Sequence, residues 1–238
     1  MQLSRRLQRI ADYVTVGKRT ADIGCDHGWV SIYLVKNKIS PSVIAMDVRE
    51  GPLNRAEKHV QEYHLEDKIE TRISDGMAAL KPGEVESVVI AGLGGPLMIR
   101  ILEEGDLVAA ELEEMILSPQ SELEKVRRFL ASKGWKTVRE EMVFDEGKYY
   151  TIMKVVHGKI EEATLADFRY GKYMIENGDP VLQAFLKKEL DVKKEILKKI
   201  CNSDTSSCRD RAEQLNEELE VIKEAMNRLE ERQRGKYI

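Results

Sequence analysis

A cluster of acidic, glycine and histidine residues directly after the first strand-like segment carries the strongest chemical signal in the chain. It is the stretch ADIGCDHG, residues 21–28. Its two glycines are spaced for a tight strand-to-helix turn, where the backbone can approach a ligand closely. Asp26 stands where a dinucleotide-binding loop has its second glycine, so a pyrophosphate would meet a carboxylate there. A ligand that carries positive charge suits this loop better.

Three further loops end in residues of the same kind. Asp47 closes the second strand-like run, a position from which a carboxylate can accept both hydroxyls of a ribose. Asp75-Gly76 follows the third run, and Ala91-Gly92-Leu93-Gly94-Gly95 follows the fourth. In a doubly wound sheet the carboxyl ends of neighbouring strands form one crevice, so the four loops should converge on a single ligand. Together their residue types fit a nucleoside that carries a positive charge beside it.

An alternation of strands and helices up to about residue 157 would position these loops. Runs rich in Val and Ile predict strands at 20–24, 43–47, 69–74, 88–91 and 115–117. Amphipathic spacing predicts helices at 4–14, 29–37, 51–63, 95–104 and 121–133. This order predicts right-handed crossovers and an α/β, Rossmann-like doubly wound, mostly parallel sheet with helices on both faces.

The pattern changes after the fifth strand. Residues 136–144 and 149–156 read as two strands joined by the turn Asp145-Glu146-Gly147-Lys148, which predicts a closing antiparallel hairpin. Beyond Gly158 the composition is helical, and Asp179-Pro180 should start a long helix. We therefore expect a Rossmann-like α/β domain at 1–158 and a helical coiled-coil domain at 159–238.

The helical domain has two stripes of apolar residues at heptad spacing. One runs through Leu186, Leu190, Leu197 and Ile200, with the polar Lys193 at the same spacing, and the other is Leu215, Leu219, Ile222, Met226 and Leu229. These stripes predict an antiparallel coiled coil, or half of an intermolecular one. The short polar break at 201–208 favours pairing within the chain, and hence a monomer.

Composition limits the function classes. The 238 residues are 42% apolar and 34% charged, with 6 Pro and 16 Gly, as in a soluble globular protein. No apolar stretch approaches about 18 residues and the N-terminus lacks a secretory signal, so we expect a cytoplasmic protein without membrane contact. A net charge of −4 gives no global attraction to phosphate. Cys25, Cys201 and Cys208 are too scattered for a disulfide scaffold or a metal site, and no metal is expected.

The chain resembles the class I S-adenosylmethionine-dependent methyltransferases, and as a whole it is similar to the bacterial tRNA (adenine-22-N1)-methyltransferase family. The resemblance rests on LSRRLQRIADYV, ADIGCDHG, ISDG followed by IAGLGG, ILSPQ, the GKYY turn and the helical tail. It departs from the family at Trp29 and Ser31, where Tyr and Pro are more usual, and at Ser118-Pro119-Gln120, where Gln-Pro-Asn is common. The Asn-Pro-Pro-Tyr signature of exocyclic adenine methylation is absent, which suits attack by a ring nitrogen.

The resemblance implies an enzyme that uses S-adenosyl-L-methionine to methylate N1 of adenosine 22 in tRNA. The residues expected to bind this cofactor are Asp22, Gly24, Cys25, Gly28, Asp47, Asp75, Gly76, Ala91, Gly92 and Gly94. The residues expected at the reacting atoms are Asp26, to stabilise the charge on the product, His27, and Trp29, to stack on an extruded adenine. Those expected to bind tRNA are Arg5, Arg6, Arg9, Lys187, Lys194 and Lys198.

Several alternatives stay open on the sequence alone. Asp22 could hold loop amides, Asp26 and His27 could be structural, and Trp29 could pack in the helix. The lysines of the tail share their face with Asp191 and Glu195, which is typical of a solvated surface. The enzyme could act on another RNA adenosine or a small molecule. A non-catalytic coiled-coil adaptor is the alternative from a different class.

Overall fold

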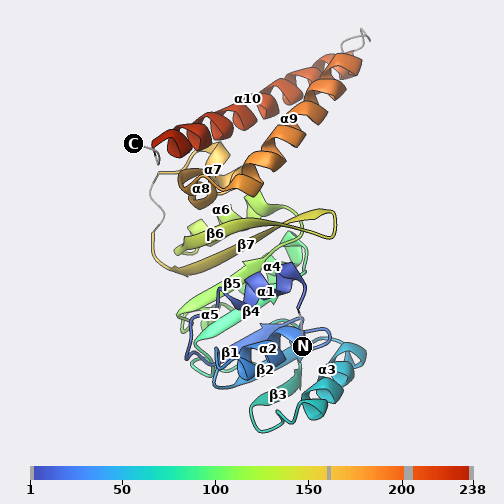
Figure 1. Cartoon of the computed structure of the whole chain (residues 1–238), viewed down its shortest axis with the longest axis vertical. Helices are drawn as coiled ribbons and strands as arrows, with labels where there is room; N and C mark the ends of the chain where they lie inside the picture. Colours follow the sequence, from blue (N-terminus) through green and yellow to red (C-terminus); the bar gives the residue numbers. More distant parts are fainter. Residues whose placement is uncertain (1–2, 160–161, 201–205, 236–238) are drawn as a thin grey trace. The chain divides into compact units, whose positions relative to one another are not determined.

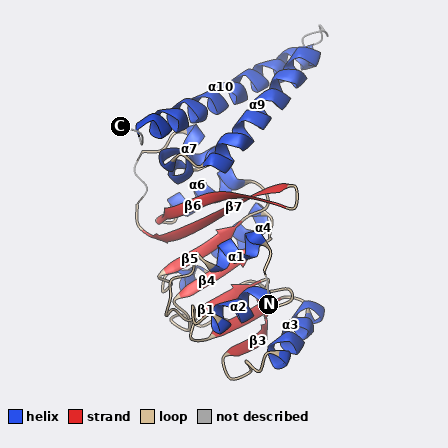
Figure 2. Cartoon of the chain, viewed as in Figure 1, coloured by secondary structure: helices blue, strands red, loops and turns tan. Residues whose placement is uncertain are grey.

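The fold was analysed in a computed structural model that describes residues 3–159, 162–200 and 206–235. The chain divides into two compact units, Met1–Ile160 and Glu161–Ile238. The first unit holds every strand among the described residues, and the second is built from helices (Figures 1 and 2). No helix in the described ranges is long and apolar enough to cross a bilayer.

The first unit is a seven-stranded sheet in the order β3-β2-β1-β4-β5-β7-β6. Its parallel strands are β1 (Thr20–Ile23), β2 (Val43–Asp47), β3 (Ile69–Ile73), β4 (Ser87–Ala91) and β5 (Glu114–Ser118). The chain winds outward from β1 to β3, then returns so that β4 pairs with the other side of β1. This reversal between β1 and β4 creates the switch point at which doubly wound sheets bind ligands.

Helices cover both faces of this sheet because the strands are apolar on both sides. On one face lie α1 (Arg5–Ala11), α2 (Trp29–Lys36) and α3 (Glu50–Glu62), and on the other lie α4 (Gly95–Glu104), α5 (Asp106–Ala109) and α6 (Leu123–Ser132). In β2, Val43 and Ala45 pack on the first group, whereas Met46 packs on the second. Such two-sided burial is the mark of a parallel sheet with crossover helices.

The sheet ends in the predicted hairpin. Strands β6 (Trp135–Asp145) and β7 (Lys148–His157) are joined at Glu146-Gly147, and β7 pairs antiparallel with β5. Glu146 and Gly147 both have positive φ, as a two-residue turn of the I′ type requires. Because β7 runs against β5, its first residues and the turn project beyond the carboxyl end of β5, as the pairing of Leu117 with Met153 shows.

The second unit packs two short helices against a long helical pair. Helices α7 (Leu165–Tyr170) and α8 (Lys172–Asn177) contact α10 (Ser206–Gly235), which also runs beside α9 (Pro180–Ile200) (Figure 1). Asp179 caps α9 as expected, because its Oδ1 accepts hydrogen bonds of 2.8 Å from the amides of Val181 and Leu182. Residues 201–205 of the expected break at 201–208 lie outside the described residues, and the break does not extend to 206–208, which belong to α10.

The apolar stripe of α10 differs in one position from the heptad prediction. The buried positions are Leu215, Leu219, Ile222, Ala225 and Leu229, while Met226 is only half-buried. The reason is that α7 and α8 pack on α10 in addition to α9, so its buried face is wider than a two-helix stripe. In α9, Leu186 is buried, and Lys193 pairs with Glu218 of α10 instead of packing as an apolar residue.

Candidate functional site

The loop after β1 is fixed to the neighbouring strand by its backbone. The amides of Gly24 and Cys25 donate to the carbonyl oxygen of Met46 at 2.8 and 2.9 Å. Gly24 has φ of +75° and Gly28 of +71°, a conformation that favours glycine. A Cβ on Gly28 would lie 3.0 Å from that of Ala56, so this glycine also lets α2 approach α3 closely. The Cys25 thiol is buried, which raises its pKa and makes it a poor nucleophile.

Asp22 is buried at the end of β1 and is held by a serine. The Ser31 hydroxyl on α2 donates a 2.7 Å hydrogen bond to Asp22 Oδ2. Burial raises the pKa of the Asp22 carboxyl to about 6, and the hydrogen bond from Ser31 opposes that rise. Ser31 occupies one of the positions at which the chain departs from the family pattern, and the sequence did not indicate that it would bond Asp22.

Asp26, His27 and Trp29 lie at the turn into α2, and each makes different contacts. Asp26 has φ of +50°, a strained conformation for a residue other than glycine, and its side chain is 62% exposed. One carboxylate oxygen lies 3.3 Å from the Arg55 guanidinium and the other 3.6 Å from His27 Nε2. Asp26 is therefore accessible at the mouth of the loop.

The indole of Trp29 stacks on the ring of His59 of α3, with centroids 4.0 Å apart. The Nδ1 atom of His59 donates to the carbonyl oxygen of His27 at 2.9 Å. One face of Trp29 is thus occupied by the protein itself. Neither this ring stack nor the Arg55–Asp26 pair was predicted, because contacts between α3 and the loop after β1 depend on tertiary packing.

Asp47 ends β2 with one carboxylate oxygen occupied and the other available. The amide of Arg49 donates to Oδ1 at 2.9 Å, and no described residue donates to Oδ2. The side chain is 8% exposed, so the available oxygen lies in a largely dry position. The next residue, Val48, is 58% exposed and offers apolar surface beside the carboxylate.

Asp75 follows β3 and is paired with an arginine that the sequence reading did not single out. Arg100 of α4 reaches its carboxylate with two bonds of 2.9 and 3.2 Å. The adjacent Gly76 has φ of +58°, and a Cβ there would lie 2.9 Å from the side chain of Ile101. Gly76 therefore allows the loop after β3 to lie against α4.

The glycines after β4 bring the backbone next to the loop after β5. The Gly92 amide donates to the Ser118 carbonyl oxygen at 3.2 Å, and the Gly95 amide donates to Ser121 Oγ at the same distance. Gly94 caps α4, while a Cβ on Gly95 would lie 2.4 Å from the Ser121 carbonyl oxygen. Ala91 is the last residue of β4 and stands half-buried at the same edge.

The basic residues expected to bind tRNA differ in whether they contact other residues of the protein. Arg9 makes a two-pronged pair with Glu141 at 2.7 and 2.6 Å, which raises the pKa of its guanidinium. Arg6 lies over the ring of Tyr150, and Arg5 is exposed. On α9, Lys187, Lys194 and Lys198 are exposed as predicted, and Lys198 bonds Glu195 at 2.9 Å.

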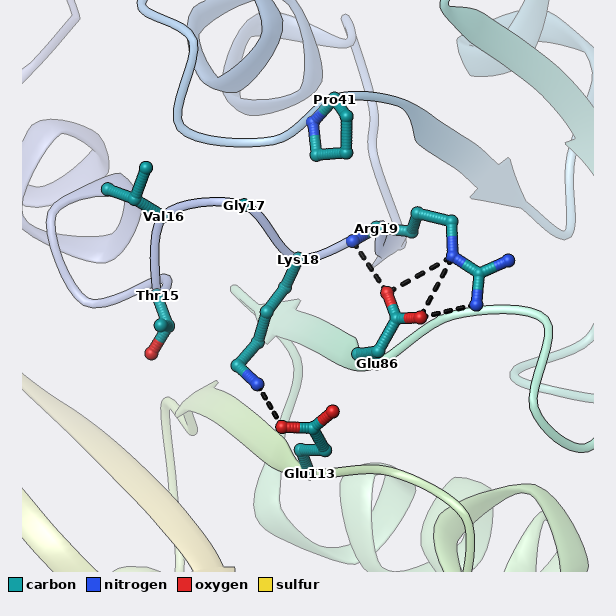
Figure 3. Close-up of a pocket in the computed structure, with 8 residues that line it drawn as sticks. All are labelled: Thr15, Val16, Gly17, Lys18, Arg19, Pro41, Glu86 and Glu113. Carbon is teal, nitrogen blue, oxygen red and sulfur yellow. Dashed lines mark hydrogen bonds and ion pairs between the residues drawn. The ribbon is translucent and has the colours of Figure 1, made fainter.

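A separate hollow lies at the opposite, amino-terminal edge of the sheet (Figure 3). It is lined by Thr15, Val16, Gly17, Lys18, Arg19, Pro41, Glu86 and Glu113. Its charges pair with one another: the Arg19 amide and Nε bond Glu86 at 2.8 and 2.9 Å, and Lys18 bonds Glu113. We assign no ligand to it, since the loops that carry the acidic residues and glycines gather at the other edge.

Comparison with known proteins finds methyltransferases by sequence and by structure. The model of a family described as a methyltransferase domain matches residues 3–153. A Bacillus subtilis protein named tRNA (adenine(22)-N(1))-methyltransferase is 30% identical over 95% of this chain and 98% of its own. The crystal structure of the Bacillus subtilis m1A22 tRNA methyltransferase matches with a TM-score of 0.85 at 28% identity, over 94% of this chain and 99% of its own. A candidate tRNA (m1A22) methyltransferase of Streptococcus pneumoniae, solved in complex with S-adenosyl-L-methionine, matches at 31% identity and a TM-score of 0.85, over 94% and 100%.

Proposed function

The chain belongs to the tRNA (adenine(22)-N(1))-methyltransferase family, and from that premise we propose that it transfers a methyl group from S-adenosylmethionine to N1 of adenosine 22 in tRNA. The observation that carries the proposal is the convergence of four loops at the carboxyl edge of the sheet, after β1, β2, β3 and β4. A doubly wound sheet binds its ligand at that edge, beside the point where the strand order reverses.

The residues at this edge fit a nucleoside that carries a sulfonium. Asp47 Oδ2 is available to accept a ribose hydroxyl, and the exposed Val48 provides apolar surface for a base. Gly24 presents only backbone in the first loop, with the Leu93 side chain 3.6 Å from where its Cβ would lie, while Asp22 and Asp26 give that loop negative charge. Bound there, S-adenosylmethionine supplies an electrophilic methyl group. Asp75 and Gly76 would border the base, with Arg100 holding Asp75 in place.

Methyl transfer to N1 of adenine requires little of the protein beyond the correct placement of the reacting atoms. N1 of adenine has a lone pair in the neutral base, so no strong general base is needed, and no metal is required to activate it. Alignment and exclusion of water are the main contributions of a site of this kind. Because the methylated base acquires a positive charge, the exposed carboxylate of Asp26 is suited to stabilise it. His27 is placed beside Asp26 by their 3.6 Å contact.

Adenine N1 lies on the Watson–Crick edge, so the nucleotide has to leave its stack to react. Trp29 already stacks on His59, which fixes the plane of its ring. We place Trp29 at the border of the acceptor site, where a ring of fixed orientation loses little conformational entropy when a base stacks on it. The backbone of Gly92 and Gly94 lines the other side.

We assign the second unit to tRNA binding through the exposed lysines of α9, together with Arg5, Arg6 and Arg9 of the first unit. Phosphate contacts by Lys and Arg supply most of the affinity of proteins for nucleic acids. Because α10 buries its apolar stripe against α7, α8 and α9, and Leu182 and Leu186 of α9 are buried as well, we propose that the chain acts as a monomer. A substrate of this kind places the enzyme in the cytoplasm.

Methyl transfer to unfractionated tRNA tests the proposal. The full chain is incubated with labelled S-adenosylmethionine and tRNA, and the modified nucleoside is identified after digestion. The expected product is 1-methyladenosine. Labelled N6-methyladenosine would indicate a different acceptor atom, and absence of any binding to S-adenosylhomocysteine would favour the non-catalytic adaptor.

A further inference from the structure

Two side chains from distant parts of the sequence meet at Gly92. A Cβ built on Gly92 would lie 3.8 Å from Arg6 Nη1 and 3.8 Å from Gln120 Nε2. Arg6 comes from α1 and Gln120 from the loop after β5, while Gly92 belongs to the loop after β4 that faces the cofactor edge. With φ of +84°, Gly92 keeps the space between these two side chains free of any side chain of its own.

Arg6 is held in place with no ionic partner in the described part of the chain. Its guanidinium carbon lies 4.7 Å above the centre of the Tyr150 ring, and its backbone amide donates to Asp145 Oδ2 at 3.0 Å. Its Nη1 atom is buried and has no hydrogen-bond partner among the described residues. Arg9, one turn later, has its guanidinium charge satisfied by Glu141. A buried N–H donor without a partner carries a free-energy cost that a bound acceptor would remove.

Gln120 presents a solvent-facing side-chain amide on the other side of Gly92. Its backbone is fixed, because its amide donates to the Leu93 carbonyl oxygen at 2.9 Å. Its side chain is exposed and makes no hydrogen bond to the described part of the chain. The hydroxyl of Ser118, two residues earlier in the sequence, is buried and has no hydrogen-bond partner among the described residues. The buried Arg6 Nη1 and the exposed Gln120 amide, both beside Gly92, indicate a position for a polar ligand.

We propose that Arg6 and Gln120 form the subsite that holds the acceptor nucleotide, an inference that rests on the proposed function and assigns the substrate contacts within it. A glutamine amide pairs with N6 and N7 of adenine, which leaves N1 free to react. Arg6, oriented by Tyr150, binds the phosphate of the same nucleotide through charge-assisted hydrogen bonds. The phosphate is the better partner for a cation because the base itself becomes positive on methylation.

The contact of Gln120 with N7 is tested by removing each partner in turn. Two tRNA transcripts are compared, one with adenosine and one with 7-deazaadenosine at position 22, and kcat/KM is measured for the wild type and Gln120→Ala. We expect the wild type to lose roughly five- to ten-fold on the 7-deaza transcript. Gln120→Ala should lose roughly ten-fold on the adenosine transcript and nothing further on the 7-deaza one. Equal losses from 7-deaza substitution in both proteins would overturn the contact.

The contact of Arg6 with a phosphate is tested by salt dependence. The slope of log(kcat/KM) for tRNA against log[salt] should fall by roughly 0.7 to 0.9 in Arg6→Ala. Arg6→Lys, which keeps the charge, should retain most of the slope. Arg19→Ala is the matched control, because Arg19 is ion-paired at the opposite edge of the sheet. An unchanged slope in Arg6→Ala would overturn the assignment.

Binding of S-adenosylhomocysteine, measured by calorimetry, distinguishes a failure of the subsite from a failure of the proposed function. The variants should bind it as the wild type does, which also shows that they are folded. If the wild type methylates tRNA but the 7-deaza substitution lowers kcat/KM equally in the wild type and in Gln120→Ala, the subsite alone is overturned. A wild type that binds the nucleoside but modifies no tRNA overturns the proposed function and the subsite with it.

Discussion

Ser31 of α2 donates a 2.7 Å hydrogen bond to Asp22 of β1, and both side chains are buried. The bond links α2, which follows the loop after β1, to β1 itself, so both ends of that loop are fixed. Because the pKa of Asp22 is raised to about 6 by burial, this carboxylate changes charge within a pH range in which the protein can be studied.

Replacement of Asp22 by Asn should stabilise the free protein at high pH. The folded-state pKa of about 6 lies above the unfolded value of about 3.9, so charging Asp22 removes stability as the pH rises through that window. Asp22→Asn should therefore gain at most about 3 kcal/mol in the free energy of unfolding at pH 8. Urea unfolding at several pH values measures it. A gain that does not shrink between pH 8 and pH 4 would contradict the assignment.

Loss of the Ser31 hydroxyl should have the opposite effect at high pH. Hydrogen bonds to charged groups contribute about 1.5–3 kcal/mol, so Ser31→Ala should lose roughly that much at pH 8, and less where Asp22 is protonated. The control is Ser132→Ala, since this exposed hydroxyl bonds only the Phe129 carbonyl oxygen at the end of α6. Equal losses in the two variants would show that the Ser31–Asp22 bond stabilises the fold no more than the exposed Ser132 hydroxyl does.

The sequence predicted the sheet well because periodicity and turn residues determine it locally. The doubly wound fold class is confirmed, the five parallel strands lie within one or two residues of their expected positions, and the hairpin turn is at Glu146-Gly147. Helices α5, α7 and α8 were missed, since four to six residues are too few to show an apolar period. The capping box of Thr164 and Asp167 was the available signal for α7.

The candidate site was only partly accessible from the sequence. The glycines and carboxylates stand at strand ends and could be placed by counting, so Asp22, Asp47 and Asp75 lie at the expected edge. Their partners could not be found that way, because Ser31 and Arg100 reach them from helices through tertiary packing. The roles assigned to these residues, and the division of function between the two units, stay predictions.

Asp47→Ala should impair cofactor binding. The variant removes the available carboxylate oxygen at the end of β2, so we expect affinity for S-adenosylhomocysteine to fall at least roughly ten-fold, the equivalent of about 1.4 kcal/mol. Calorimetry with the full chain measures this. Asp67→Ala, at an exposed position before β3, serves as the control. Unchanged affinity in Asp47→Ala would exclude a contact with the ribose.

Removal of Lys187, Lys194 and Lys198 from α9 should weaken tRNA binding without affecting the cofactor. The triple variant Lys187→Ala, Lys194→Ala, Lys198→Ala should reduce the salt slope of tRNA binding by roughly two, if each lysine contacts a phosphate for most of the time. Fluorescence anisotropy with labelled tRNA measures it. The control removes Lys38, Lys68 and Lys81, which are exposed near the amino edge of the sheet. Equal losses in both triple variants would show that only total charge matters.

Methylation of N1 of adenosine 22 is tested most directly with two tRNA transcripts that differ only at position 22. The full chain is given labelled S-adenosylmethionine with each transcript separately, and the label is mapped to a nucleotide. We predict 1-methyladenosine at position 22 of the adenosine transcript and no label in the transcript with guanosine there. Equal labelling of both transcripts, or labelling of neither, would contradict it.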